Sequence, residues 1–180
     1  MEALLLSIQK RLAEQVIDLV DVDVNWGQLM AEQDYYPVQF PCALIRIDSI
    51  VWKPSGEGLL YGDARVTVTV AVSLPGDTHY TSGVAQASLA TLEIASKVNA
   101  ALHRFAGHIL PSAADGEYYD NNFSPLCLVA SRIEQYSGDV AAIAHTYECA
   151  IVSDGSHTPL IPLKGVTLVP VITQEEEQQP

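Results

Sequence analysis

The feature that most constrains the fold is a change of hydrophobic period between two neighbouring segments. Arg65–Val72 reads R-V-T-V-T-V-A-V, and strict alternation is how a β-strand buries one of its two sides. About twenty residues further on, apolar positions recur every three or four residues, which is how a helix buries one face. These positions are Ile94, Val98, Ala101, Leu102 and Phe105. The chain is therefore expected to lay a helix against a half-buried sheet.

The first half of the chain predicts a helix followed by a hairpin. An amphipathic helix is expected over Glu2–Leu19, with its apolar face made by Leu4, Leu5, Ile8, Leu12 and Val16. A long connection over Asp21–Pro41 carries aromatic residues and has room for a short strand near Val20–Val24. Strands predicted over Cys42–Trp52 and Leu60–Leu74 are joined by turn residues, and they form an antiparallel hairpin.

The second half predicts the same order again. A helix over Val84–Phe105 can be N-capped by Thr81 or Ser82, and Gly107 and Pro111 bring it to an end. Strands over Leu126–Tyr136 and Val140–Val152 form a second hairpin. The expected fold is α+β: a mainly antiparallel sheet of two hairpins, with two helices packed on one face.

The end of the chain differs in composition from the rest. A run at Val166–Ile172 is apolar and could add an edge strand, although prolines surround it. The last eight residues, 173–180, are acidic and polar and have nothing to bury. We therefore expect one α+β domain over residues 1–172 and a disordered acidic tail over 173–180.

Net charge and cysteine content narrow the class of protein. The 180 residues include nine Lys and Arg against 22 Asp and Glu, which gives a formal net charge of −13. Such a surface repels phosphate, so specific nucleic-acid binding and attachment to an anionic membrane are disfavoured. No apolar run approaches the roughly 20 residues that a membrane span needs. Three cysteines cannot all pair, so buried free thiols in a reducing cytosol are expected at Cys42, Cys127 and Cys149.

No motif in the sequence predicts a cofactor or metal site. Gly56, Gly58 and Gly62 join strand to strand, whereas a phosphate-binding loop opens a helix. His103 and His108 are five residues apart, which is not the spacing of a zinc pair on a helix. We therefore expect neither a cofactor nor a metal.

Oxygen-bearing side chains occur in two places where calcium binding or catalysis has to be considered. The loop 115–122 is rich in such groups, but its spacing misses the EF-hand pattern, and a solvated loop is the better interpretation. Asp48, Asp63 and Glu148 lie on or beside predicted strands, where a solvated sheet face explains them. Paired carboxylates could still meet in three dimensions, but no nucleophile motif accompanies them. We expect the protein not to be an enzyme.

Aromatic residues are the most suggestive candidates for function. Eight of them lie mostly in loops or at strand ends, where half-polar rings often anchor contacts between subunits. Capping the ends of the protein's own core is the alternative role. The candidate subunit-contact residues are Trp26, Tyr35, Tyr36, Trp52, Tyr61, Tyr118, Tyr119 and Phe123.

The order of these elements resembles the tail terminator proteins of long-tailed bacteriophages and prophages, also called tail completion or minor tail proteins. The resemblance is carried by the amphipathic helix Leu4–Val16, the wandering loop ending in Phe40-Pro41, the long alternating strand Arg65–Leu74, the helix Val84–Phe105 and a last strand over Thr146–Val152. It covers residues 1–153. This chain departs from shorter family members after Asp154 and in the loop Ser112–Ser124.

The resemblance implies a structural protein with several partners. Such proteins assemble into a ring, typically a hexamer, that caps the finished tail tube and presents a surface to the head–tail connector. The implied location is the virion tail, with assembly in the bacterial cytoplasm. An acidic ring interior would let DNA pass without sticking, which the charge of −13 suits.

Two other hypotheses stay open at this point. The first is a different virion part, such as a head-completion or other connector protein. The second is a small enzyme or ligand-binding domain, whose pocket lies between sheet and helices and receives Tyr118, Asp120 or His103. A cluster of groups with shifted pKa values in a deep pocket would favour the second hypothesis.

Overall fold

The computed structural model describes residues 2–30, 38–54, 59–74, 76, 78–106, 123–135 and 139–154. Three helices and five strands occur in this part of the chain. In chain order they are α1 (Glu2–Gln15), β1 (Asp21–Val24), β2 (Cys42–Pro54), β3 (Leu59–Ser73), α2 (Ala85–Ala90), α3 (Glu93–Leu102), β4 (Cys127–Gln135) and β5 (Val140–Asp154).

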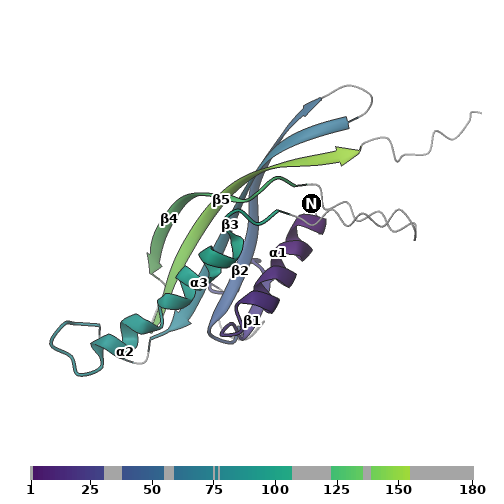
Figure 1. Ribbon diagram of the computed structural model, residues 1–180. Helices are drawn as coiled ribbons and strands as arrows, with labels where there is room; N and C mark the ends of the chain where they lie inside the picture. Colours follow the sequence, from purple (N-terminus) through teal and green to yellow (C-terminus); the bar gives the residue numbers. More distant parts are fainter. Residues whose placement is uncertain are drawn as a thin grey trace, which may run out of the picture.

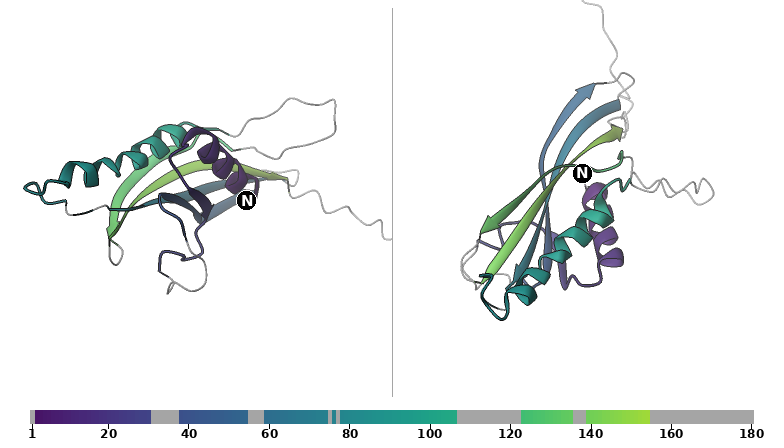
Figure 2. Two further views of the ribbon diagram at one scale, coloured as in Figure 1. Left: turned by 90° about the horizontal axis from the view of Figure 1, so that it is seen from below. Right: turned by 60° about the vertical axis from the view of Figure 1, so that its left-hand side comes forward.

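The strands form one sheet in the order β1-β2-β3-β5-β4. Strand β1 is parallel to β2, and every other neighbouring pair is antiparallel. Both predicted hairpins are present, as β2 with β3 and as β4 with β5 (Figure 1). Helices α1 and α3 lie over the same face of the sheet (Figure 2). The predicted α+β fold is therefore confirmed.

The core lies between this face and the helices. The valines of the alternating segment, Val66, Val68, Val70 and Val72, are all buried there. Helix α1 contributes Leu4, Ile8 and Leu12, and α3 contributes Ile94, Val98, Ala101 and Leu102. The alternating residues of β3 and the helically spaced residues of α1 and α3 thus pack together in one apolar layer. Burial of this layer is the main contribution to the stability of the fold.

Two polar side chains of β5 are also buried beneath α3. His145 donates Nε2–H to the carbonyl oxygen of Ala95 at 3.0 Å, because a carbonyl can only accept. Its Nδ1 then accepts from the Ser131 hydroxyl at 2.8 Å. The Tyr147 hydroxyl donates to Asn99 Oδ1 at 3.2 Å. These bonds satisfy the polar atoms that the strand brings under the helix.

The prediction of one long helix over Val84–Phe105 is wrong in one respect, because the structure has two shorter helices there. Helix α2 ends at Ala90, and α3 begins at Glu93. The Thr91 hydroxyl donates to the carbonyl oxygen of Ser88 at 2.7 Å, a local bond that competes with the helical ladder. The predicted cap also differs: Val84 occupies the N-cap position without a side-chain bond. Ser82 instead accepts a bond from the Val84 amide at 3.3 Å.

Regular alternation along Cys42–Trp52 would place Val51 on the same face as Ile45 and Ile47, but β2 departs from it beyond its middle. The register with β3 shifts between Ile47 and Ser49, which marks a β-bulge. After the bulge, Ile50 rather than Val51 packs against the core, and Val51 is 57% exposed. One extra residue in a strand moves every later side chain to the opposite face.

Several element ends differ slightly, and some predictions cannot be compared with the structure. Helix α1 ends at Gln15 rather than Leu19, although Val16 is still buried. The short strand expected near Val20–Val24 is β1, and it is confirmed. The run Val166–Ile172, the tail 173–180 and the single-domain boundary at residue 172 lie outside the described residues. None of the described helices is long and apolar enough to cross a membrane.

Candidate functional site on the helix-free face

The face of the sheet opposite the valines is largely covered in its middle. Thr67 and Thr69 are each 3% exposed and Ala71 is fully buried, while Arg65 is exposed. Long side chains from β2 and β4 and the segment after β1 lie over this part of the sheet. The face therefore combines a closed middle with an exposed charged region. We call it the helix-free face.

Among the residues that the structure describes, four ion pairs lie on the helix-free face. Their members are Arg46 with Asp48, Lys53 with Asp63, Arg65 with Glu148, and Arg132 with Glu134. The pairs are partly or largely exposed, so each one stabilises the fold only slightly. They use four of the nine basic residues of the chain. The charges of these eight residues therefore cancel, although the chain carries a net charge of −13.

The Arg65 pair also joins two strands. Arg65 lies on β3 directly opposite Glu148 on β5, and the pair is hydrogen-bonded through Arg65 Nε at 3.2 Å. This hydrogen bond, with the charge of Glu148, raises the pKa of Arg65 above its ordinary value. Asp48, Asp63 and Glu148 thus lie on an exposed sheet face, where the sequence placed them, and each has a basic partner.

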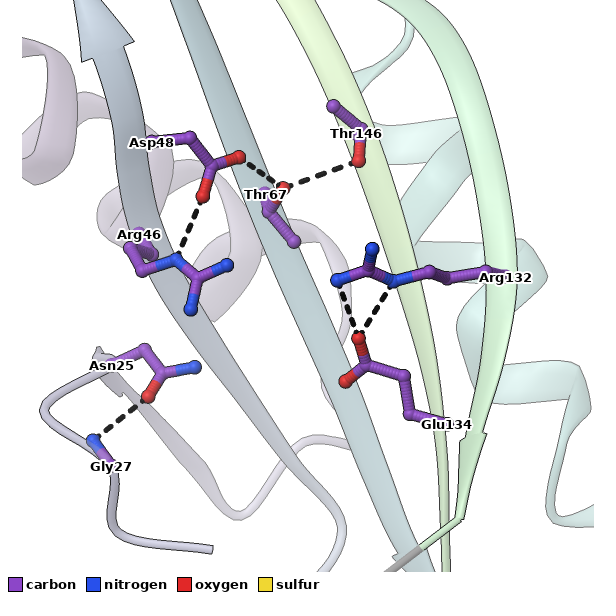
Figure 3. A network of polar contacts seen from close by, with 8 residues as sticks. All are labelled: Asn25, Gly27, Arg46, Asp48, Thr67, Arg132, Glu134 and Thr146. Atoms are coloured by element: carbon purple, nitrogen blue, oxygen red, sulfur yellow. Dashed lines mark hydrogen bonds and ion pairs between the residues drawn. The ribbon is translucent and has the colours of Figure 1, made fainter. Parts of the chain in front are cut away.

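A hydrogen-bonded row crosses the middle of this face. The Thr67 hydroxyl donates to Asp48 Oδ2 at 2.5 Å and lies 3.2 Å from the Thr146 hydroxyl. Asp48 Oδ1 accepts from Arg46 Nε at 2.7 Å. Figure 3 shows this row beside a second arginine, Arg132, whose side chain extends from β4 across β5 toward β3 and Arg46. Two strands that are not neighbours thus direct cations at the same region.

The turn after β1 closes one side of this region. The Gly27 amide donates to Asn25 Oδ1 at 2.9 Å, and the Met30 amide donates to the Gly27 carbonyl at 2.9 Å. Gly27 has φ +93°, a left-handed conformation that favours glycine. The Gln28 side chain donates back to the Val24 carbonyl at 2.7 Å. These bonds fix the turn, so Trp26 is 81% exposed on a well-defined backbone.

A pocket of about 450 Å³ lies between this turn and the strands. Its floor includes Thr69, and its walls are the turn on one side and charged side chains of β2 and β4 on the other. The lining residues are Asn25, Trp26, Gly27, Leu29, Met30, Arg46, Thr69, Arg132 and Glu134. The pocket thus has an apolar side and a side made of ion-paired charged groups, with Thr69 at its base.

A small apolar cluster lies next to the pocket on the same face. Cys42, Leu44, Ala71 and Ala142 are buried there, and Leu29, Val38 and Phe40 pack against them. Burial raises the pKa of the Cys42 thiol to about 12, so it is an unreactive thiol. The cluster holds the segment between β1 and β2 against the sheet, and it thereby positions the pocket wall.

The long strands project beyond the helices at the other end of the sheet (Figure 1). We call Val51–Pro54 with Leu59–Tyr61 the projecting arm. Trp52 is 39% exposed and Tyr61 is 45% exposed. Trp52 lies opposite Gly62, where a Cβ atom would come within 2.9 Å of the indole ring and 2.7 Å of Ile50 Cγ2. Glycine at this position therefore lets the indole lie flat on β3.

The eight candidate contact residues have different locations. Trp26 lines the pocket, and Trp52 and Tyr61 lie on the projecting arm. Phe123 is 7% exposed and packs edge-on against Phe105 at 5.7 Å, so it has the alternative role of capping the core. The other four lie outside the described residues: Tyr35, Tyr36, Tyr118 and Tyr119. The structure brings no two of the eight into one site within the described part of the chain.

Sequence reasoning missed the polar half of the pocket. Arg46, Thr69 and Arg132 come from three strands and are distant in sequence. Strand alternation alone would place Arg46 and Thr69 on one face, since Thr69 pairs with Leu44 two residues before Arg46. Arg132 could join them only with the strand order known, because β5 separates β4 from β3.

The candidate metal and phosphate positions give no site in the described residues. His103 Nδ1 accepts from the Leu128 amide at 3.3 Å. Within the ranges that the structure describes, no group of three or more His, Cys, Asp or Glu could hold a metal ion. His108, Gly56, Gly58, Asp120 and the loop 115–122 lie outside those ranges.

Comparison with known proteins gives structural likenesses. No family model matches the chain, and no curated protein matches it. A solved chain from the structure titled "Virion of native gene transfer agent (GTA) particle" matches with a TM-score of 0.50 and 10% sequence identity. The match covers 84% of this chain and 96% of that chain. At this identity the likeness shows a shared fold.

Proposed function

We propose that the chain is a structural protein of a virion and that it acts as the tail terminator. It caps the tail tube and joins the tail to the head. The observation that carries the proposal is the fold shared with a virion chain over 96% of that chain's length. The element order also supports it, because the helix-hairpin-helix-hairpin order on which the resemblance to tail terminators rests is present in the structure.

The surface of the molecule supports an assembly role. Trp26, Trp52 and Tyr61 are exposed on a fixed turn and on the projecting arm, and aromatic residues are enriched where proteins bind each other. The proposed partners are further copies in a ring, which we take to be a hexamer, the tail tube protein and the head–tail connector. A completed ring covers the growing face of the tube, so further tube subunits find no complementary surface.

We assign the protein no catalytic role in this proposal. The described groups with pKa values moved by burial are His145, Tyr147, Cys42 and Cys149. None of them lines the pocket on the helix-free face. Each is shifted chiefly by its own desolvation in the packed interior, which is typical of structural positions. The proposed location is the virion tail, after assembly in the bacterial cytoplasm.

Polymerisation of purified tail tube protein tests the proposal. Tubes grown with the chain should stop at shorter lengths and carry extra density at one end in electron micrographs. Tubes that grow to equal lengths with no bound chain would refute tail termination. Binding to the head connector without binding to tubes would identify a head-completion protein instead. Chain carrying Tyr80→Ala, a change at an exposed site on the helix side, serves as the control that should still cap.

A further inference from the structure

We propose that residues 166–172 of the chain pair with the outer side of β2 in the projecting arm of the same molecule. The side of Ser49–Pro54 that faces away from β3 is called the arm edge below. This inference goes beyond the proposed function and does not rest on it, since it concerns how the free chain covers its own sheet. Three features carry it: an edge that no described strand covers, exposed apolar side chains beside that edge, and the composition and length of the chain after β5.

The arm edge has no partner strand in the described part of the chain. Strand β1 pairs with β2 only from Cys42 to Ile45, and the Asn25 amide then donates to the Ile45 carbonyl at 2.8 Å. Beyond the bulge, β2 pairs with β3 from Ser49 to Pro54, on its other side. The backbone N–H and C=O groups along the arm edge are therefore available to an added strand.

The opposite side of the arm, along β5, is already paired. Strand β4 pairs with β5 as far as Glu148. Further along, the Ser124 amide donates to the Ala150 carbonyl at 2.8 Å, and Phe123 forms a bridge with Ile151. Pairing on this side thus continues close to the end of β5, which leaves the β2 side as the place for an added strand in the arm.

Apolar side chains beside the arm edge are exposed on both faces of the sheet. Trp52 lies on the helix side, over Gly62, and is 39% exposed. Val51 lies on the helix-free face and is 57% exposed. Successive residues of a strand point to opposite faces, so one added strand can cover both side chains only if it is apolar on both of its own faces.

Residues 166–172 have this composition. They read V-T-L-V-P-V-I, and all but Thr167 are apolar. The branched residues among them favour a strand. Pro170 has no N–H to donate, which a strand tolerates at the edge of a sheet, where that position can face away from its neighbour. A strand added along the arm edge is the outermost one, so Pro170 is compatible with this place and not with the middle of a sheet.

The intervening chain has the length and direction that this placement needs. Strand β5 ends at Asp154, opposite Leu59 at the end of the arm. From there the arm edge is three inter-strand spacings away, roughly 14 Å, across β3 and β2. Residues 155–165 can span up to about 36 Å. Because β2 runs toward the end of the arm, a chain that returns from that end lies antiparallel to it, and its short connection favours the same molecule over a second copy.

Photo-cross-linking from the arm edge of the full chain tests the placement. Benzoylphenylalanine is introduced in place of Val51, and trypsin cleavage after Lys164 releases residues 165–180 as one peptide. We expect irradiation to join this peptide to position 51 in the monomer band of a denaturing gel. The same group in place of Ile133, an 80% exposed position on the edge strand β4, is the control and should not capture the peptide.

Two substitutions of equal charge separate strand pairing from chance contact. Val169→Asp should lower the cross-link yield by about tenfold or more, because pairing would bury a carboxylate among apolar side chains. Gln178→Asp adds the same charge outside the apolar run and should leave the yield unchanged. In a Trp26→Phe background, the Trp52 emission should shift to longer wavelength with Val169→Asp only. Circular dichroism checks that both variants fold.

The remaining outcomes contradict the proposal. Capture of residues 165–180 in a dimer band would show that the strand comes from a second copy. Cross-links from position 51 to other segments alone would give the arm edge a different occupant. Capture from position 133 instead would place the strand beside β4, and a yield that ignores Val169→Asp would show that no specific pairing exists.

Discussion

The two faces of the sheet differ in how their side chains are packed and paired, and we propose that they differ in role. The helix-covered face is almost wholly apolar, and its few polar groups, such as His145 and Tyr147, have partners inside the chain. The helix-free face instead carries four partly exposed ion pairs, a pocket and the exposed rings of Trp26 and Tyr61. One strand, β3, thus borders the core on one side and, on the other, the surface that we propose for contact with partners.

The largest expected effect comes from removing packing on the helix-covered face. Leu102, the last residue of α3, is fully buried against the sheet, so Leu102→Ala should lower the free energy of unfolding by about 2–5 kcal/mol. Ile133→Ala, at an 80% exposed position on β4, is the matched control and should change it by less than about 0.5 kcal/mol. Urea denaturation measures both. Equal losses would show that this face does not hold the core.

An intermediate loss of stability is expected from adding a side chain at Gly62, because Trp52 packs closely against this glycine in the projecting arm. Gly62→Ala places a Cβ within 2.9 Å of the Trp52 ring and 2.7 Å of Ile50, which should destabilise by about 1–3 kcal/mol. Gly83→Ala is the control, because nothing lies within 4 Å of its added Cβ. The tryptophan emission spectrum should shift for Gly62→Ala only. An unchanged spectrum and melting temperature for Gly62→Ala would contradict the placement of the indole.

The smallest expected effect is a pH dependence of folding stability, which comes from His145 on the helix-covered face. Burial lowers the pKa of His145, so the unfolded chain binds its proton more readily than the folded chain. Stability from this group is therefore complete above the unfolded pKa of about 6.5 and is lost as the pH falls below it, at up to about 1.4 kcal/mol per pH unit. His145→Gln should flatten the melting temperature between pH 7.5 and 5.5, relative to wild type. Parallel curves for the two proteins would argue against this assignment.

Periodicity in the sequence was enough to predict the helix-covered face. The alternation in Arg65–Val72 gave the buried valines, and the helical spacing from Ile94 to Leu102 gave the face of α3. Both signals are local, because a strand or helix that buries one side repeats its apolar residues at its own period. The break at Thr91 escaped prediction, since a single hydroxyl bond to Ser88 leaves no trace in that period.

The helix-free face could not be predicted in the same way. Its pocket joins the turn after β1 to side chains of β2, β3 and β4, and these meet only through the strand order. The bulge after Ile47 also reversed the expected faces of Ile50 and Val51, and no glycine or proline marks it. Exposed aromatic residues gave a partial signal: Trp26 and Tyr61 were candidates, while Arg46 and Thr69 were not.

The proposal that the helix-free face contacts partners can be tested directly in the assembled state. Hydroxyl-radical footprinting compares side-chain oxidation in the free chain and in the chain bound to tail tubes. Trp26 and Met30 on the helix-free face are as exposed as Ile17 and Tyr80 on the helix side, which makes them matched reporters. We predict protection of Trp26 and Met30 with Ile17 and Tyr80 unchanged. Protection confined to Ile17 and Tyr80 would contradict the assignment of the helix-free face to contact.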